Sequence, residues 1–142
     1  MHPRVATLLP LYHLPRLLDD EYYMALAHSV EVNKRYAWFY SLQAAAGKHV
    51  ILDNSAVELG HPMEFPRYIQ LAANISATEI MLPDWYKDAS KTLMSMRDAL
   101  KYIEFRRSAG FNVGYHPRIM VIPQGTDIRD WERCACHMLE EP

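Results

Sequence analysis

Three short apolar runs along the chain each end on a polar residue, and a helical pattern follows each of them. The runs cover 49–54 (HVILDN), 79–84 (EIMLPD) and 118–125 (RIMVIPQG). Runs this short and rich in Val and Ile are typical of buried strands in a parallel sheet. Ligands bind beyond the carboxyl ends of such strands. The pattern therefore predicts that Asp53, Asp84 and Gln124 project toward one site.

The rest of the pattern completes four successive strand–helix units. Strands are predicted over 4–9, 50–52, 79–82 and 118–122. Helices are predicted over 19–46 with a break near Asn33, over 66–74, from Asp88 or Ser90 to Gly110, and from Thr126 or Asp127 onward. Helical spacing supports the first helix through Tyr22, Leu26 and Val30. It also predicts that the last helix buries Ile128, Trp131, Ala135 and Met138.

Four such units predict an α/β fold in one domain over residues 1–142. A complete (β/α)₈ barrel needs about 250 residues, with roughly 200 as the lower end. The prediction is therefore a partial, half TIM-type barrel of parallel β/α units. A small open doubly wound sheet is the alternative, and periodicity does not separate the two. Because an open half-barrel leaves two strand edges bare, we expect a second polypeptide or a homodimer to complete it.

Composition narrows the partners and the location. Half of the residues are apolar, enough for a sizeable core, and the formal net charge is −2. That charge gives no overall basic field for gripping nucleic acid, although a local patch could suffice. No apolar stretch approaches the roughly 20 residues of a membrane span, and no signal peptide is evident. We expect a cytoplasmic protein with no membrane partner.

The Cys134, Cys136 and His137 cluster raises the question of a metal. Residues two apart on a helix face different sides, so both sulfurs cannot easily bind one ion. Only Cys134 and His137 share a face, and no second ligand pair lies nearby. We expect no metal site in this chain.

Read in order, the three strand ends resemble the tRNA-guanine transglycosylase superfamily. The segment 52–58 (LDNSAVE) is similar to a family strand that ends in Asp, small residues and a polar one. Asp84, followed by Lys91-Thr92 and Ser95-Met96-Arg97, is a looser match to a second family strand, and 122–125 (IPQG) resembles a third. The segments 12–15 (YHLP) and 22–28 (YYMALAH) resemble shorter phage and bacterial relatives that modify DNA with deazaguanines.

The resemblance implies a (β/α)₈ enzyme that exchanges guanine in a nucleic acid for a 7-deazaguanine, with DNA favoured over tRNA. It places Asp53 near the reacting sugar, where the carboxylate is suited to proton transfer as the catalytic residue or to base contact. It implies that Asp84 reads the N–H edge of the purine, that Gln124 can both donate to and accept from the base, and that the Gly125 N–H meets its carbonyl.

The same resemblance suggests further contacts and a missing half. The residues expected to add to the binding site are Asn54, Glu58, Tyr12 and His13, with Tyr12, Tyr86 or Trp85 stacking on the ring. The family's attacking Asp and its structural zinc belong to a later segment, so no cofactor is expected in this chain. That segment would come from another polypeptide or a paired half-barrel, unless the chain is a truncated product.

Plainer alternatives accompany these interpretations. An Asp or a Gln-Gly pair after a strand can simply form a turn or cap a helix, which applies to Asp53, Asp84 and Gln124 alike. The chain could then be a non-catalytic binding or assembly subunit, because a fold does not fix a function. A phosphate-using sugar or nucleotide barrel is disfavoured because no Gly-rich phosphate loop is evident.

Overall fold

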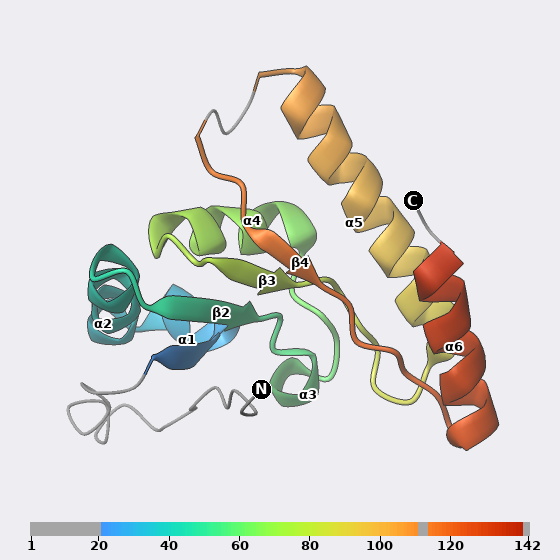
Figure 1. Ribbon diagram of the computed structural model, residues 1–142. Coiled ribbons are helices and arrows are strands. Elements are labelled where there is room, and N and C mark those ends of the chain that lie inside the picture. The colour runs from blue at the N-terminus through green and yellow to red at the C-terminus, as the bar shows by residue number, and fades with distance from the viewer. Residues whose placement is uncertain (1–20, 111–113, 141–142) are drawn as a thin grey trace.

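The computed structural model describes residues 21–110 and 114–140, which form a mixed α/β domain (Figure 1). The strands are β1 (Tyr22–Leu26), β2 (His49–Asp53), β3 (Glu79–Met81) and β4 (Arg118–Met120). The helices are α1 (Ala27–Val32), α2 (Lys34–Ala45), α3 (Ala56–Leu59), α4 (Phe65–Asn74), α5 (Ala89–Ser108) and α6 (Ile128–Glu140). None of the helices in these two stretches combines the length and apolar composition that a bilayer crossing requires.

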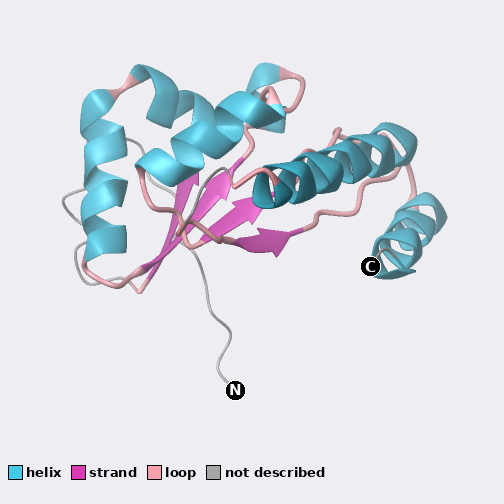
Figure 2. Cartoon of the chain, turned by 90° about the horizontal axis from the view of Figure 1, so that it is seen from above, coloured by secondary structure: helices cyan, strands magenta, loops and turns pink. Residues whose placement is uncertain are grey.

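The strands form one parallel sheet in the order β1-β2-β3-β4. In register, Ala25 lies beside Leu52, Leu52 beside Ile80, and Ile80 beside Ile119. A doubly wound sheet reverses its strand order at one point, and the described strands show no reversal. Helices gather along one side of the strands (Figure 2). The α/β class with parallel β/α units is therefore confirmed.

The main core lies between this sheet and the helices of its first three strands. Alternate strand residues supply one wall of it, namely Tyr23, Ala25, Val50, Leu52 and Ile80. The helix side is rich in tyrosine: Tyr36, Tyr40 and Tyr68 are buried there with Phe39 and Ile69. These rings bury a large apolar area while their hydroxyls reach backbone groups of the strands.

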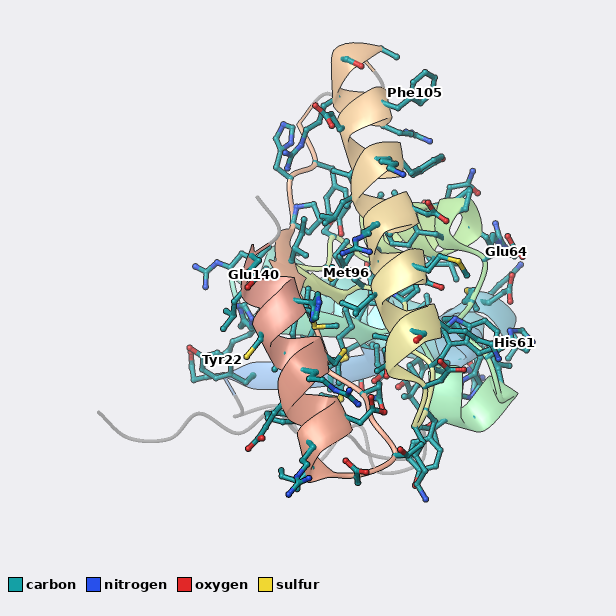
Figure 3. The ribbon with its side chains drawn as sticks, turned by 90° about the vertical axis from the view of Figure 1, so that its right-hand side faces the viewer. Tyr22, His61, Glu64, Met96, Phe105 and Glu140 are labelled. Atoms are coloured by element: carbon teal, nitrogen blue, oxygen red, sulfur yellow. The ribbon has the colours of Figure 1, made fainter. Side chains whose placement is uncertain are left out.

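A second, smaller core joins α5 to α6. It contains Leu82, Met96, Ala99, Cys134 and Met138. Figure 3 shows the two helices side by side with Met96 where they meet, and Phe105 projecting from the far end of α5. Phe105 is 61% exposed, so the C-terminal part of α5 extends beyond this packing.

Strands β2, β3 and β4 lie where the apolar runs predict them, but β1 does not. The prediction of helix over 19–46 is wrong at Tyr22–Leu26, which is a strand. All five of its residues are in register with β2, and the alternate residues Tyr23 and Ala25 are fully buried. Pairing with β2 thus outweighs the helical spacing of this segment. The predicted strand over 4–9 lies outside the described residues.

The predicted break near Asn33 is confirmed. Its side-chain oxygen accepts hydrogen bonds from the backbone N–H groups of Arg35 and Tyr36, at 3.0 and 3.2 Å. Asn33 therefore caps α2 and separates it from α1, since an N-cap residue takes non-helical backbone angles.

The last helix begins as predicted, with the Asp127 side chain accepting from the Asp130 N–H at 2.9 Å. Its buried face is narrower than predicted. Met138 is buried, whereas Ile128 and Trp131 are 67% and 43% exposed. The prediction that those two are buried is wrong, because α6 packs mainly on α5 and has no second layer over it among the described residues.

Candidate functional site

Polar side chains from three neighbouring strands meet at one edge of the sheet. The strands run the same way, so their carboxyl ends lie together (Figure 1). Asp53 ends β2, Asp84 follows β3 and Gln124 follows β4. The loops bring Asp84 and Gln124 into direct contact, and Asp53 is close enough to sense the charge of Asp84. Parallel pairing of adjacent strands thus produces the predicted convergence.

Asp84 is the centre of this cluster, because an amide from each side holds its carboxylate. Asn54 Nδ2 donates to Asp84 Oδ1 at 2.6 Å, and Gln124 Nε2 donates to Asp84 Oδ2 at 2.5 Å. The two amides are themselves fixed: Asn54 Nδ2 also donates to Leu82 O at 2.9 Å, and Gln124 Oε1 accepts from Lys87 N at 3.1 Å. A carboxylate offers about four acceptor positions, so roughly two on Asp84 remain for a ligand.

Asp53 lies at the same edge in a different environment. Its Oδ1 accepts from the Ser55 backbone N–H at 2.6 Å. Burial raises the pKa of the Asp53 carboxyl, and the carboxylates of Glu58 and Asp84 raise it further. The Ser55 N–H and His28 act in the opposite direction, but burial is the largest influence on this pKa. A carboxyl tuned in this way is suited to carrying a proton during a reaction.

The sequence interpretation missed two residues beside Asp53, namely His28 and Ser55. Ser55 is fully buried and has a left-handed backbone, with φ 60°. Such a conformation costs a non-glycine residue about 1 kcal/mol or more. Its Oγ lies 3.0 Å from His28 Nδ1 and accepts from the His28 backbone N–H at 3.2 Å. His28 comes from α1, so only the folded sheet brings the pair together.

The buried side chain of Tyr68 bridges β2 and β3 next to this edge of the sheet. The Tyr68 hydroxyl donates to Leu52 O at 2.5 Å and accepts from the Met81 N–H at 3.0 Å. The Tyr68 hydroxyl oxygen therefore replaces a backbone hydrogen bond between β2 and β3, whose pairing ends at Leu52 and Ile80. Burial raises the pKa of Tyr68 well above its ordinary value, so the hydroxyl keeps its proton. The two strands separate just before the Asp53–Asp84 cluster.

The other predicted site residues take different positions. Glu58 is exposed on α3 and contributes negative charge near Asp53. Gly125 packs against the backbone of α6: a Cβ there would lie 2.3 Å from Trp131 N. This contact gives Gly125 a packing reason to be small, in addition to the predicted approach of a substrate carbonyl. Tyr12 and His13 lie outside the described residues.

Two aromatic candidates for stacking follow Asp84 directly. Trp85 Nε1 donates to Ser95 Oγ at 2.9 Å, and Lys91 lies 5.0 Å from the ring, so Trp85 packs on α5. Tyr86 is 66% exposed beside the cluster. Tyr86 is the more exposed of the two described rings, and Lys87 Nζ lies over it, 5.1 Å from the ring centroid.

Within the described part of the chain, no group of three or more His, Cys, Asp and Glu side chains is arranged to hold a metal ion. Cys134 is buried in the α5–α6 core and Cys136 is exposed, so the two sulfurs point to different surroundings. This is the geometry expected for helix positions two apart.

Comparison of the chain with protein-family models, curated proteins and solved structures finds no match in any of the three.

Proposed function

We propose that this chain forms the base-recognition side of a transglycosylase-like enzyme that exchanges guanine for a 7-deazaguanine in nucleic acid, DNA rather than tRNA. The observation that supports it most is the Asp84 carboxylate, held by Asn54 and Gln124 at the edge where Asp53 lies. In this proposal the strand ends of a partial TIM-type barrel form the mouth of the purine site.

Asp84 is suited to the edge of the purine that carries adjacent N–H donors. An ionised carboxylate accepts two donors at once, and charge-assisted hydrogen bonds are about twice as strong as neutral ones. Because Asn54 and Gln124 already orient Asp84, little further ordering is required when the base binds. Tyr86 would stack on the ring, and the Gly125 N–H would meet the carbonyl.

The proposed chemistry uses Asp53 to move one proton in each direction. A carboxylate attacks the sugar C1′, the C1′–N9 bond breaks, and its electron pair stays on guanine N9, which takes the proton of Asp53. The incoming 7-deazaguanine returns its N9 proton to Asp53, and its nitrogen attacks C1′ as the enzyme carboxylate leaves. The raised pKa of Asp53 suits both steps, because a carboxyl that holds its proton more tightly is a better partner for proton transfer.

The attacking carboxylate would come from a segment that adds to the open edge of the sheet. Among the described strands β4 pairs with β3 alone, and Ile119 and Val121 are exposed there. Such an edge normally requires a cover. We propose that a second polypeptide or a second copy of the chain completes the barrel. Cys134 and Cys136 are both free thiols, which suits the proposed cytoplasmic location.

Calorimetric titration of a 7-deazaguanine base into the chain tests the base-recognition role. Asp84→Asn keeps the shape of the side chain and removes the charge, so affinity should fall roughly 10- to 100-fold, the effect of about 1.5–3 kcal/mol for a charged hydrogen bond. Glu104→Gln is the matched control, because Glu104 is an exposed carboxylate on α5. Equal affinity of wild type and Asp84→Asn would end the assignment.

A non-catalytic assembly subunit is the competing proposal, and the exposed edge of β4 supports it. Incorporation of labelled guanine into DNA separates the two. Exchange by the chain alone, or only when a candidate second half is added, supports an enzyme. Assembly with that half and no exchange supports the subunit.

A further inference from the structure

The turn after β2 is held by a side chain from the neighbouring strand unit. His28 Nδ1 lies 3.0 Å from Ser55 Oγ, and His28 Nε2 lies 3.1 Å from Ser29 Oγ. The Ser55 oxygen also accepts from the His28 backbone N–H at 3.2 Å. Two contacts thus fasten the start of α1 to the single residue that connects Asn54 to α3.

The imidazole of His28 bonds to one hydroxyl at each ring nitrogen. Ser55 Oγ has one proton and two lone pairs, and one lone pair accepts from the His28 backbone N–H. Toward His28 Nδ1 the same hydroxyl donates or accepts according to the imidazole tautomer, and the same holds for Ser29 Oγ at Nε2. In either tautomer the Nδ1 contact joins His28 to Ser55.

Ser55 transmits this restraint to Asp53. Its left-handed backbone, with φ 60° and ψ 28°, is the conformation in which the Ser55 N–H donates to Asp53 Oδ1 at 2.6 Å. Serine does not favour that conformation by itself. The hydrogen bonds of its hydroxyl to the backbone N–H and the imidazole of His28 stabilise it.

We propose that His28 is a positioning residue: acting through Ser55, it holds the Ser55 N–H on Asp53 and so orients the carboxylate for proton transfer. The catalytic use of this positioning rests on the function proposed above. The contacts of His28, Ser55 and Asp53 themselves are present in the chain without any ligand. His28 does not touch the substrate in this proposal, so it is distinct from the residues that read the base.

Several other groups interact with the charge of Asp53, and their effect on its pKa has to be distinguished from that of His28. The carboxylates are Glu58 on α3 and Asp84 after β3. The buried hydroxyls of Tyr36 on α2 and Tyr68 on α4 also sense the Asp53 charge. A test has to vary the hydrogen bond to Ser55 while leaving these four groups unchanged.

The test compares His28→Asn with His28→Gln. The Asn amide can place its oxygen or its nitrogen at the position of Nδ1 and bond to Ser55 Oγ in either direction, whereas the longer Gln places its polar atoms near the position of Nε2. The readout is the titration of the Asp53 carboxyl carbon by NMR in the chain without ligand. His28→Gln and Ser55→Ala should shift the midpoint upward because the Ser55 N–H leaves Asp53, and His28→Asn should stay near the wild-type midpoint.

Each outcome decides the inference. An unchanged midpoint in His28→Gln and Ser55→Ala overturns it. A shift in His28→Asn equal to that in His28→Gln also overturns it, since the charge of His28 would then be the cause. Ser95→Ala, which removes a hydrogen bond to Trp85 on α5, is the control for a general loss of packing and should leave Asp53 unchanged.

Base exchange gives a second readout. His28→Gln should lower kcat by about tenfold with little change in KM, and His28→Asn should restore most of it, because about 1.4 kcal/mol of transition-state stabilisation is a factor of ten. If neither wild type nor any variant exchanges a base when the candidate second half is present, the proposed function fails, while the titration still decides whether His28 positions Asp53.

Discussion

The side-chain amide of Gln124 donates a hydrogen bond to Asp84 Oδ2 at 2.5 Å, although the two residues are 40 positions apart in the chain. The side-chain oxygen of the same amide, Gln124 Oε1, accepts from the Lys87 backbone N–H. One amide therefore connects the loops after β3 and β4 and fixes the direction in which Asp84 faces.

Replacement of Gln124 tests this connection. Gln124→Met has a similar size and loses both hydrogen bonds, so the free energy of unfolding should fall by about 1–2 kcal/mol. Gln124→Glu should cost more at neutral pH, because two carboxylates then face each other. In the folded state of that variant the two facing carboxylates bind a proton between them more tightly than the unfolded chain does. The loss of unfolding free energy relative to wild type should therefore shrink as the pH falls. Urea unfolding at about pH 5 and pH 7 measures both effects.

A Gln124→Glu variant as stable as wild type at neutral pH would contradict the direct contact between Gln124 and Asp84. Asp98→Asn is a suitable control, because Asp98 is an exposed carboxylate on α5.

Asp53 makes the stability of the chain depend on pH. Burial raises the pKa of its carboxyl above that of an unfolded Asp, which is about 3.9. The folded state therefore holds the Asp53 proton more tightly than the unfolded state, and this contribution is complete below the unfolded pKa and lost as the pH rises through the folded pKa. Asp53→Asn cannot ionise and keeps an oxygen that can accept from the Ser55 N–H. Its stability relative to wild type should rise across that window.

Urea unfolding between about pH 3 and pH 7 measures this difference. Glu58→Gln removes one of the charges that raise the Asp53 pKa, so its pH dependence should be smaller than that of wild type. A difference between Asp53→Asn and wild type that stays constant with pH would rule out a perturbed Asp53.

Tyr68 should contribute more through its hydroxyl than other buried tyrosines. Tyr68→Phe leaves both Leu52 C=O and Met81 N–H without their partner, and should lower the free energy of unfolding by about 3 kcal/mol. Tyr115 is partly buried, and its hydroxyl donates to one backbone carbonyl, Ala77 O, at 3.0 Å. Tyr115→Phe is the comparison, with a loss of about 1 kcal/mol. Equal losses in the two variants would show that Tyr68 does not bridge β2 and β3.

Gly125 should resist any side chain. In Gly125→Ala the new Cβ would lie 2.3 Å from Trp131 N and 2.8 Å from the carbonyl carbon of Asp130, both backbone atoms of α6. The helix has to move, at a cost of roughly 1–3 kcal/mol for overpacking. Gly60→Ala is the comparison, because no atom lies within 4 Å of its new Cβ and only its positive φ of 76° opposes the change.

Thermal unfolding and tryptophan fluorescence report the two glycine variants. Gly125→Ala should change the emission of Trp131 at the start of α6 as well as the melting temperature. Gly60→Ala should lower the melting temperature without that spectral change. The same emission in Gly125→Ala as in wild type would mean that α6 does not rest on Gly125.

The sequence predicted the part of the site that comes from β2, β3 and β4. Each of these strands is a short apolar run closed by polar residues, a pattern typical of strands in a parallel sheet. The polar ends had to meet once adjacent strands paired in parallel, and Asp84 and Gln124 do so. Their roles in binding or catalysis stay predictions.

Local sequence determined the helix ends as well. Asn33 and Asp127 accept hydrogen bonds from the first turns of α2 and α6, which depends on residues within three positions along the chain. Only the tertiary structure decided that Tyr22–Leu26 is a strand, because its helical spacing is overridden by pairing with β2. The sequence likewise did not predict the contact of His28 with Ser55, because the two residues are 27 positions apart and belong to different strand units. It also depends on a left-handed backbone at Ser55, which serine adopts only when its neighbours stabilise it.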